Sequence, residues 1–416
     1  MVLTGIFLLH LAGSLSFGQS YESFRAEMRQ IREETRFRIG PFYLSPKLAF
    51  NDMGYDNNVY YQREEDDPVS DFTGTFSPSV TVYLPIRSYI IFSLTENPEY
   101  VYFFDQKKER RWNNEISPSL RLLLFRRFVL SGTYVHSNRR RRGSSEFDVR
   151  ATIVTDSYSA EFFYETARLT SIGFSWRMQN IEFEDTVEPG QDINFALRLN
   201  RQEKEGHLEF YYRVSSASFF FLKAGYTDYS FDNIESRWRD SYSYQAYTGL
   251  RFPIMGRVTG MISLGYKKLS PRLEDKQGFS GIVGDTEVEV QFFRFSLRLR
   301  YTRDSQFSYQ PNNVFFIENR YGGGLSFYLS RSLKLDYEFT AGKNSYPESM
   351  TVLFPDQTLM DIFREDTYYT HSIGFMVRII DRIGVGLKAN FWERNSNIFL
   401  ENRSRWFAGL DFTYEF

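Results

Sequence analysis

Hydrophobic and polar residues alternate with a period of two along most of this chain. In residues 294–302 (RFSLRLRYT), aromatic or aliphatic side chains occupy every second position, and arginine, serine and threonine lie between them. Residues 332–342 and 383–391 repeat the pattern. Successive side chains of a β-strand point to opposite faces of its sheet, so the pattern predicts strands with one apolar and one polar face. Alternation alone fits both a soluble β-sandwich and a membrane barrel.

The connections between these segments alternate in length, and this distinguishes the two folds. Short links with proline, glycine or paired charges lie at 84–88, 124–128, 252–257, 329–332 and 379–382. Longer polar links lie between them at 64–71, 138–146, 270–281 and 343–361. The intervening strands would be roughly 12–18 residues long, whereas strands of soluble proteins average about 5–6. This arrangement predicts an all-β fold, a transmembrane antiparallel outer-membrane β-barrel.

Counting the alternating segments predicts about 18 strands, within a range of roughly 16–20. One strand is expected near 41–54, strand pairs follow with turns near 86, 126, 166, 215, 254, 293, 330 and 380, and a last strand covers 399–416. Two segments, 146–164 and 191–213, lose the alternation midway, and we interpret each as one bulged strand. Residues 38–416 would therefore form the barrel as a single domain.

The first 37 residues carry two other patterns. Residues 1–19 combine a short apolar run with small residues, which is typical of a secretory signal peptide. Residues 20–37 form a short N-terminal helical segment, with apolar positions on one face and arginines on another. The apolar positions are Tyr21, Phe24, Met28 and Ile31, and the basic ones are Arg25, Arg29, Arg32 and Arg36. This helix is either a solvated segment before the first strand, or a periplasmic element or lumen plug.

Composition supports a barrel that faces two solvents. The 416 residues include 42 Phe and 29 Tyr, yet 25% of residues are charged and the mean hydropathy is −0.43. No stretch after the signal approaches the roughly 18 apolar residues of a spanning helix. A net charge of −2 gives no indication of nucleic-acid binding, and the absence of cysteine excludes disulfides and thiol chemistry. We expect the outer membrane of a Gram-negative bacterium, with aromatic side chains at the membrane interfaces.

The polar members of each alternation are candidates for lining the lumen. A charged side chain facing lipid at the midplane costs about 2–4 kcal/mol for Arg or Lys, so a hydrated interior is the favourable location. Alternatively, these charges form ion pairs that fill the barrel. The set is Arg121, Arg177, Lys223, Lys267, Arg294, Arg298, Arg300, Lys334, Asp336, Glu338, Arg378, Lys388, Asp411 and Glu415.

Patterns for enzymatic chemistry are absent from the sequence. The four histidines, His10, His136, His207 and His371, show no metal-ligand spacing, and there is neither a GxSxG serine motif nor a Walker A motif. We therefore predict no catalytic, cofactor-binding or metal-binding residues, and no cofactor.

Two further features predict partners. The run Arg139, Arg140, Arg141 and Arg142 is expected in a long outward loop, as a surface basic patch that is either simply solvated or binds phosphate groups of lipopolysaccharide. The last segment places Leu410, Phe412, Tyr414 and Phe416 on one face of a closing strand. These four residues resemble the C-terminal aromatic signal that the barrel-insertion machinery reads during assembly in the outer membrane.

Residues 39–62 (IGPFYLSPKLAFNDMGYDNNVYYQ) and 70–85 (SDFTGTFSPSVTVYLP), with the echo ISPSLRLLL at 116–124, carry a family resemblance. They resemble the outer-membrane barrel family of the putative β-barrel porin 2 type, which is associated with exopolysaccharide export. The resemblance implies a conduit for a secreted exopolysaccharide, working with a separate periplasmic export protein. The alternatives are a general diffusion porin for small solutes and a plugged structural or surface barrel.

Overall fold

The computed structural model describes residues 21–146, 150–166, 170–184, 194–215, 218–254, 257–353, 358–398 and 401–416. The predicted signal peptide at 1–19 lies outside these residues. The described residues form the helices α1 (Tyr21–Glu34) and α2 (Phe195–Leu199), the 3-10 helices η2 (Glu64–Asp66), η3 (Lys107–Glu109) and η4 (Ile234–Arg239), and a large sheet.

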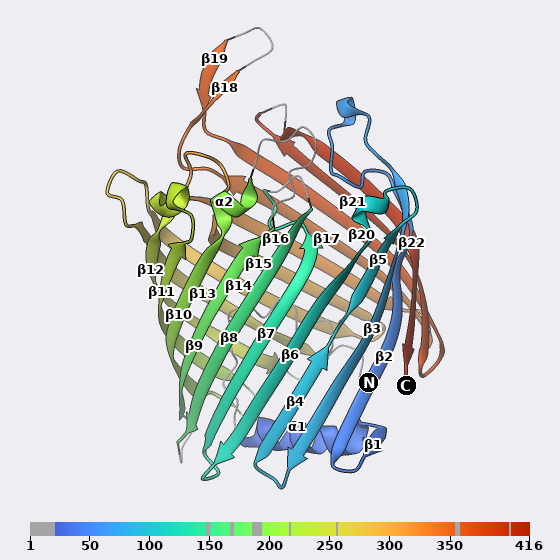
Figure 1. The fold of residues 1–416 in the computed structure, drawn as a ribbon. Helices are drawn as coiled ribbons and strands as arrows, with labels where there is room; N and C mark the ends of the chain where they lie inside the picture. The colour runs from blue at the N-terminus through green and yellow to red at the C-terminus, as the bar shows by residue number, and fades with distance from the viewer. Residues whose placement is uncertain are drawn as a thin grey trace.

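The sheet is a closed antiparallel barrel (Figure 1), and the predicted strand number of 18 is confirmed. Its last strand pairs with β2, which closes the barrel. β4 and β5 are two parts of one interrupted strand between β3 and β6. The barrel strands are β2 (Phe42–Asp56), β3 (Asp71–Ile86), β4 (Ile90–Glu96), β5 (Glu99–Phe103), β6 (Arg111–Leu124), β7 (Phe128–Arg141), β8 (Ala151–Glu165), β9 (Thr170–Phe183), β10 (Arg201–Arg213), β11 (Phe219–Phe231), β12 (Ser241–Ile254), β13 (Val258–Pro271), β14 (Phe279–Phe292), β15 (Phe295–Phe307), β16 (Phe315–Tyr328), β17 (Leu333–Ser345), β20 (Glu365–Ile380), β21 (Ile383–Ser396) and β22 (Arg403–Glu415).

Two small pairings lie outside the barrel wall. β1 (Phe37–Ile39) forms a hairpin with the start of β2. β18 (Met350–Leu353) and β19 (Leu359–Ile362) form a separate two-stranded sheet that projects above the barrel in Figure 1.

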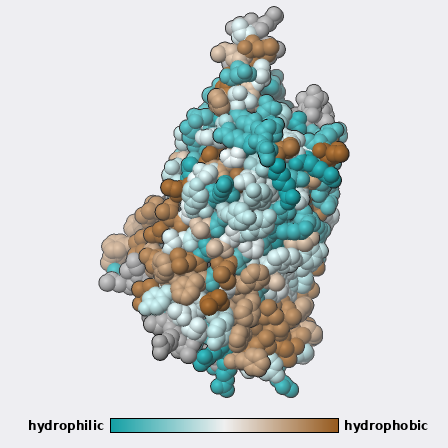
Figure 2. Space-filling view, turned by 90° about the vertical axis from the view of Figure 1, so that its left-hand side faces the viewer, coloured by the Kyte–Doolittle hydropathy of each residue, from teal (hydrophilic) through white to brown (hydrophobic). Residues whose placement is uncertain are grey.

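The exposure of side chains along a strand shows which face contacts lipid. In β15, Leu299 is 51% exposed while the polar Ser296 is 7% exposed, the reverse of what a soluble sheet shows. An apolar side chain that is more exposed than its polar neighbour must face a hydrocarbon solvent. Figure 2 shows brown apolar side chains gathered on the lower part of the visible face and teal polar ones on the upper part. A strand of 14 residues spans about 45 Å, so the strands extend beyond the roughly 30 Å hydrocarbon layer.

The two ends of the barrel differ in their connections. The lower end in Figure 1 has turns as short as the two residues Phe293 and Arg294 between β14 and β15. The upper end carries the long connections that contain α2, η4, β18 and β19. Barrels of the outer membrane have short periplasmic turns and long extracellular loops, so the lower end is periplasmic.

The predicted positions of irregularity were wrong. β8 and β10 pair with both of their neighbours in unbroken register, so neither is a bulged strand. The described residues among the additional ones precede these strands, and in the second case they include α2. The register shifts instead in β2, between Asn51 and Gly54, where Asp52 has a φ of 53°.

Candidate functional site

The inner wall around β9–β15 is a dense set of ion pairs. The guanidinium of Arg177 lies 2.6 Å from the carboxylate of Glu205, which also contacts the imidazole of His207. The ammonium of Lys223 lies 3.4 Å from Glu209, and both side chains are under 5% exposed. The ammonium of Lys267 lies 2.8 Å from Asp304, two strands away. This wall therefore presents charges that are already neutralised by neighbours on the same wall.

The inner wall around β15–β17 is more open. Arg298 lies 3.6 Å from carboxylate oxygens of Glu287, Glu289 and Glu338, and the Glu338 side chain is 56% exposed. Gly324 and Gly322 stand opposite Arg298 and Arg300 in the register of β15 and β16. A Cβ added at Gly322 would lie 3.3 Å from the Cβ of Arg300. These two glycines therefore leave room for the two arginine side chains.

A third group of charges lies beside the closing seam between β2 and β22. The ammonium of Lys388 lies 2.8 Å from Asp52 and 2.7 Å from Asp411. The Asp411 carboxylate also accepts a hydrogen bond from the backbone N–H of Asp52, at the irregularity of β2. The positive-φ residue is thus held by polar contacts to β21 and β22. These contacts fix the register where the barrel closes.

Most of the predicted lumen-lining residues are placed among these ion pairs, while three lie at the periplasmic turns. Arg294 lies in the turn before β15 and donates to the carbonyl oxygen of Leu329. Arg378 and Glu415 lie next to the ends of β20 and β22. Alternation alone did not single out the acidic partners, although all of them share their strand's inward parity and were visible in the same pattern. These partners are Glu205, Glu209, Glu287, Glu289 and Asp304. Contact with a transported substrate remains a prediction for the whole set.

The extracellular mouth contains the segment 142–146, which follows β7 and contacts the opposite side of the barrel. The carboxylate of Glu146 is fully buried there and accepts hydrogen bonds from the Ser308 hydroxyl (2.6 Å) and the Tyr309 backbone N–H (3.0 Å). Its backbone carbonyl accepts a hydrogen bond from Arg394 (3.1 Å). Burial raises the pKa of Glu146 to about 7, although the positive charge of Arg364 opposes this shift.

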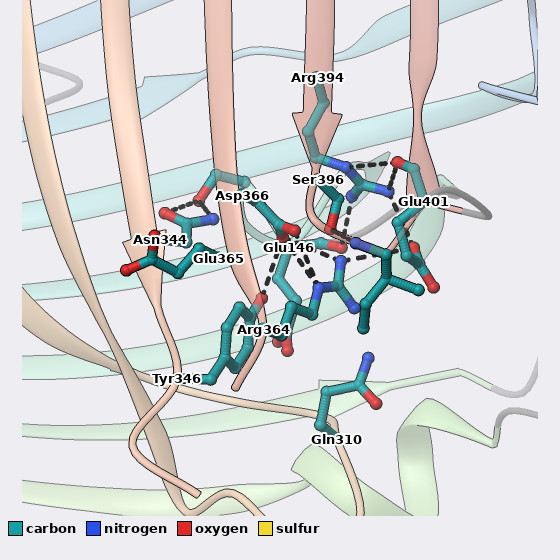
Figure 3. A network of polar contacts seen from close by, with 12 residues as sticks. Glu146, Gln310, Asn344, Tyr346, Arg364, Glu365, Asp366, Arg394, Ser396 and Glu401 are labelled. Atoms are coloured by element: carbon teal, nitrogen blue, oxygen red, sulfur yellow. Dashed lines mark hydrogen bonds and ion pairs between the residues drawn. The ribbon is translucent and has the colours of Figure 1, made fainter. Parts of the chain in front are cut away.

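Glu146 lies within a buried polar network on the opposite side of the barrel (Figure 3). The guanidinium of Arg364 lies 2.9 Å from Asp366, and neither side chain has any exposed surface. Arg394 donates to the backbone carbonyl of Glu401 at 2.7 Å and to its carboxylate at 3.0 Å. These residues come from the ends of β20 and β21 and from the loops beside them. We call Glu146, Arg364, Asp366, Arg394 and Glu401 the extracellular latch.

The location predicted for the Arg139–Arg142 run was wrong for three of its four members, because Arg139, Arg140 and Arg141 belong to β7. Arg139 lies 3.6 Å from Glu99 and from Glu115, and Arg140 lies 2.6 Å from Glu109. Arg142 does follow the strand, with its guanidinium 4.1 Å from the ring centre of Trp392 and 4.6 Å from that of Tyr61. The composition of the run indicated a solvated loop. Ion pairs with glutamates that are distant in sequence instead place Arg139 and Arg140 in the barrel wall.

The periplasmic mouth contains α1, which crosses the lower end of the barrel (Figure 1). Phe24, Met28 and Ile31 are buried in one apolar cluster with side chains on the inner face of the wall. The wall residues of this cluster are Ile91, Leu123, Val129 and Phe163, with Tyr43, Tyr83 and Tyr211 at its edge. Arg121, predicted to line the lumen, forms an ion pair with Glu27 of α1 and lies 5.7 Å from the Phe24 ring. Of the two interpretations of this helix, the structure fits the plug.

Three of the four residues of the predicted insertion signal lie on β22, the strand that closes the barrel, and Phe416 directly follows it. Leu410 is 43% exposed and Phe416 is 41% exposed. The rings of Phe412 and Phe50 are 6.3 Å apart across the seam with β2. Recognition of these residues by insertion machinery remains a prediction.

Comparison with known proteins places this architecture in a family. Residues 35–413 match the family described as Putative beta-barrel porin 2. The chain belongs to this family. As a porin-type barrel, it is an outer-membrane β-barrel channel. No match was found among curated proteins.

Solved structures similar to this porin-family chain show the same fold at low sequence identity. OccAB2 of Acinetobacter baumannii is 11% identical, with 90% of this chain and 98% of that chain covered and a TM-score of 0.50. The outer membrane protein OpdK of Pseudomonas aeruginosa is 8% identical, with 90% and 98% covered and a TM-score of 0.50. OpdQ of Pseudomonas aeruginosa is 11% identical, with 91% and 98% covered and a TM-score of 0.50.

Two observations on the described part of the porin-family chain complete the site. Its helices are all too short or too polar to cross a membrane. Its His, Asp and Glu side chains form no group of three or more that could hold a metal ion. The candidate site is therefore the lumen itself, with its charged wall and the two segments that occupy its mouths.

Proposed function

We propose that this chain is a conduit for a secreted exopolysaccharide that is held closed at both mouths until transport begins. The observation that carries the proposal is the position of α1 and of the segment 142–146, one at each end of a lumen with a polar wall. A pore for continuous diffusion of small solutes needs no such segments. A conduit for an occasional polymer requires closure, because a permanently open barrel would let periplasmic solutes leave the cell.

The charges of the wall fit a polymer that is rich in hydroxyl groups. Paired charges such as Lys267 with Asp304 still offer hydrogen-bond donors and acceptors, but they attract no single counterion strongly. A neutral or weakly charged polysaccharide would exchange hydrogen bonds along such a wall and would meet no deep binding site. Export would be driven from the periplasmic side by a separate export protein, which would displace α1.

A second candidate is a diffusion porin for small solutes, and one observation favours it. The open wall around β15–β17 exposes Glu338 by 56% and Arg300 by 37% at the side chain. Such charges could select small ions by sign, as rings of charged side chains do in channels. In that case α1 would be a constriction and not a closure.

Deleting the gene in its own bacterium separates these functions. Loss of secreted polysaccharide, with polymer accumulating in the periplasm, supports export, and complementation with the full chain should restore secretion. Unchanged secretion together with slower uptake of small hydrophilic solutes would overturn export in favour of the porin. If neither secretion nor uptake changes, the barrel is structural and both transport functions are wrong.

A further inference from the structure

The periplasmic turns combine exposed arginines with exposed large apolar side chains. Six of these turns carry at least one exposed arginine. Among the residues of the turns that the structure describes, Asp381 is the one with a carboxylate. These rim arginines are Arg87, Arg126, Arg127, Arg257, Arg294, Arg331 and Arg382. Such a ring has a strong positive potential at one level of the molecule, although the whole chain has a net charge of only −2.

Two phenylalanines at the tips of these turns have an unfavourable backbone conformation. Phe125 has a φ of 50° and Phe293 a φ of 51°, in the left-handed region that glycine and asparagine normally occupy. Phe125 contacts the Phe128 ring and Phe293 contacts the Phe292 ring edge-on, but each ring is still 88% exposed. In water, both the left-handed backbone conformation and the exposure of the apolar ring would be unfavourable. These tips are therefore expected to lie in a medium other than water.

The apolar tips continue the lipid-facing surface of the strands that lead into them. Leu124 is 42% exposed beside Phe125, and Phe292 and Phe295 are 55% and 45% exposed beside Phe293. Ile379 and Ile380 extend the same surface at the β20–β21 turn, with 61% and 52% exposure. The hydrocarbon boundary of the bilayer therefore reaches the turns, and the arginines that alternate with these side chains lie at the level of the lipid headgroups.

We propose that the periplasmic rim is a binding surface for anionic phospholipids of the inner leaflet of the outer membrane. Phe125 and Phe293 would insert between acyl chains, and the guanidinium groups would bind headgroup phosphates by charge-assisted hydrogen bonds. Each arginine near an anionic surface contributes a factor of roughly five to binding. An acidic periplasmic protein could meet the same charges, but it would not explain exposed rings that continue the lipid-facing belt.

Unfolding of the full chain in vesicles tests the arginine part of the proposal. The half-time of unfolding in urea is measured in phosphatidylcholine vesicles with and without about one third phosphatidylglycerol. We expect the anionic lipid to slow unfolding of the wild type, and the R126Q/R127Q/R294Q variant to lose most of that slowing. High salt should have the same effect as the substitutions, since exposed charges are screened.

A matched control removes three exposed charges from the extracellular side. The K107Q/K108Q/R237Q variant changes η3 and η4 and should keep the full response to phosphatidylglycerol. Equal unfolding rates of the wild type in both kinds of vesicle would overturn the proposal, whether or not the variants fold. If the control variant lost the slowing by phosphatidylglycerol to the same extent, the proposal would also be overturned. The lipid response would then depend on the net charge of the protein and not on the rim arginines. A rim that retains an acidic protein but shows no lipid response would assign the surface to that protein.

The phenylalanine part has its own test. The F125G/F293G variant relieves the left-handed strain, so it should unfold more slowly than the wild type in detergent micelles that form no bilayer. In vesicles with phosphatidylglycerol the order should reverse, because the rings no longer insert. The same order in both media would contradict insertion of the tips.

Discussion

The two mouths of the barrel are occupied by segments of opposite chemistry. At the periplasmic mouth, α1 buries Phe24, Met28 and Ile31 in an apolar cluster against the wall. At the extracellular mouth, the segment 142–146 is held by hydrogen bonds and buried ion pairs around Glu146. Apolar contacts are insensitive to pH, whereas a network with a buried carboxyl group depends on it. Each mouth can therefore respond to a different signal.

The difference also matches what each end meets. A helix held by side-chain burial can leave the wall as a unit, since its apolar contacts come from one face. The extracellular latch is assembled from four separate stretches of chain, and it faces a medium whose pH the cell does not control. Most ion pairs of the wall between the mouths involve neither segment, with Arg121 and Glu27 of α1 as an exception.

The largest effect is expected from breaking the apolar closure. In the F24D/M28D variant, two carboxylates replace side chains whose burial contributes about 1.5–3 kcal/mol each, so α1 should leave the wall. Trypsin cleavage of the folded barrel at Arg25 and Arg29 should become at least about 100-fold faster. The A26D variant places a charge on the exposed face of the same helix and should be cleaved like the wild type. Similar cleavage rates for all three proteins would contradict the apolar closure.

The next effect concerns the pH response of the latch. Burial raises the pKa of Glu146 from 4.5 to about 7, so the closed segment favours the protonated carboxyl group. This stabilisation of the closed segment is fully present below pH 4.5 and is lost as the pH rises through about 7. Opening should therefore increase on the order of 100-fold between pH 5 and 8.

Because the chain contains no cysteine, a single thiol at Ser145 can report this opening. The rate of thiol labelling is compared between the S145C protein and the S145C/E146Q protein, which corrects for the pH dependence of the thiol itself. The glutamine cannot ionise, so the second protein should show only the thiol's own dependence. Identical profiles for the two proteins would show that Glu146 does not control the latch.

A smaller effect is expected from the ring contacts of Arg142. The R142A substitution removes its contacts with Tyr61 and Trp392, which contribute about 0.5–2 kcal/mol together. Labelling at S145C should then accelerate by roughly 2- to 30-fold at every pH. The R141A variant removes the exposed arginine next to it and should have little effect. An equal acceleration in R141A would mean that loop charge, and not the ring contact, holds the segment.

The smallest effect is expected on the open wall. The E338Q substitution removes a carboxylate that is 56% exposed and 3.6 Å from Arg298, a pair worth about 0–1 kcal/mol. Trypsin cleavage and thiol labelling should both be unchanged, while the ion selectivity of any open state should shift toward anions. A change in the rate of trypsin cleavage or of thiol labelling would show that the open wall is coupled to α1 or to the segment 142–146.

The fold was predictable because its signals are local and repeated. Alternation of apolar and polar residues in β15 and β17, combined with alternating link lengths, is sufficient to derive an outer-membrane barrel and its strand number. The ends of strands were less predictable. The arginines of β7 have the composition of a loop, and the glutamates that pair with them, Glu99, Glu109 and Glu115, become neighbours only after the sheet has formed.

The two closures could not be located from the sequence. The partners of α1, such as Ile91, Leu123 and Val129, come from separate strands. One signal was present: near the periplasmic turns, these residues make the inward face of their strands apolar, which a hydrated lumen does not explain. The latch carried no comparable signal, because Glu146 lies in a loop and meets Ser308 and Arg394, which are far along the chain. The path of a loop does not follow from periodicity.

Planar-bilayer conductance tests most directly the central claim that two independent closures act in series. Four proteins are compared: the wild type, F24D/M28D, R142A/E146A, and the combination of all four substitutions. If each mouth closes the lumen by itself, the first three should show little sustained conductance, and the combined variant should show large, long-lived openings. A wild type that conducts like the combined variant, or full opening by either pair alone, would contradict the account.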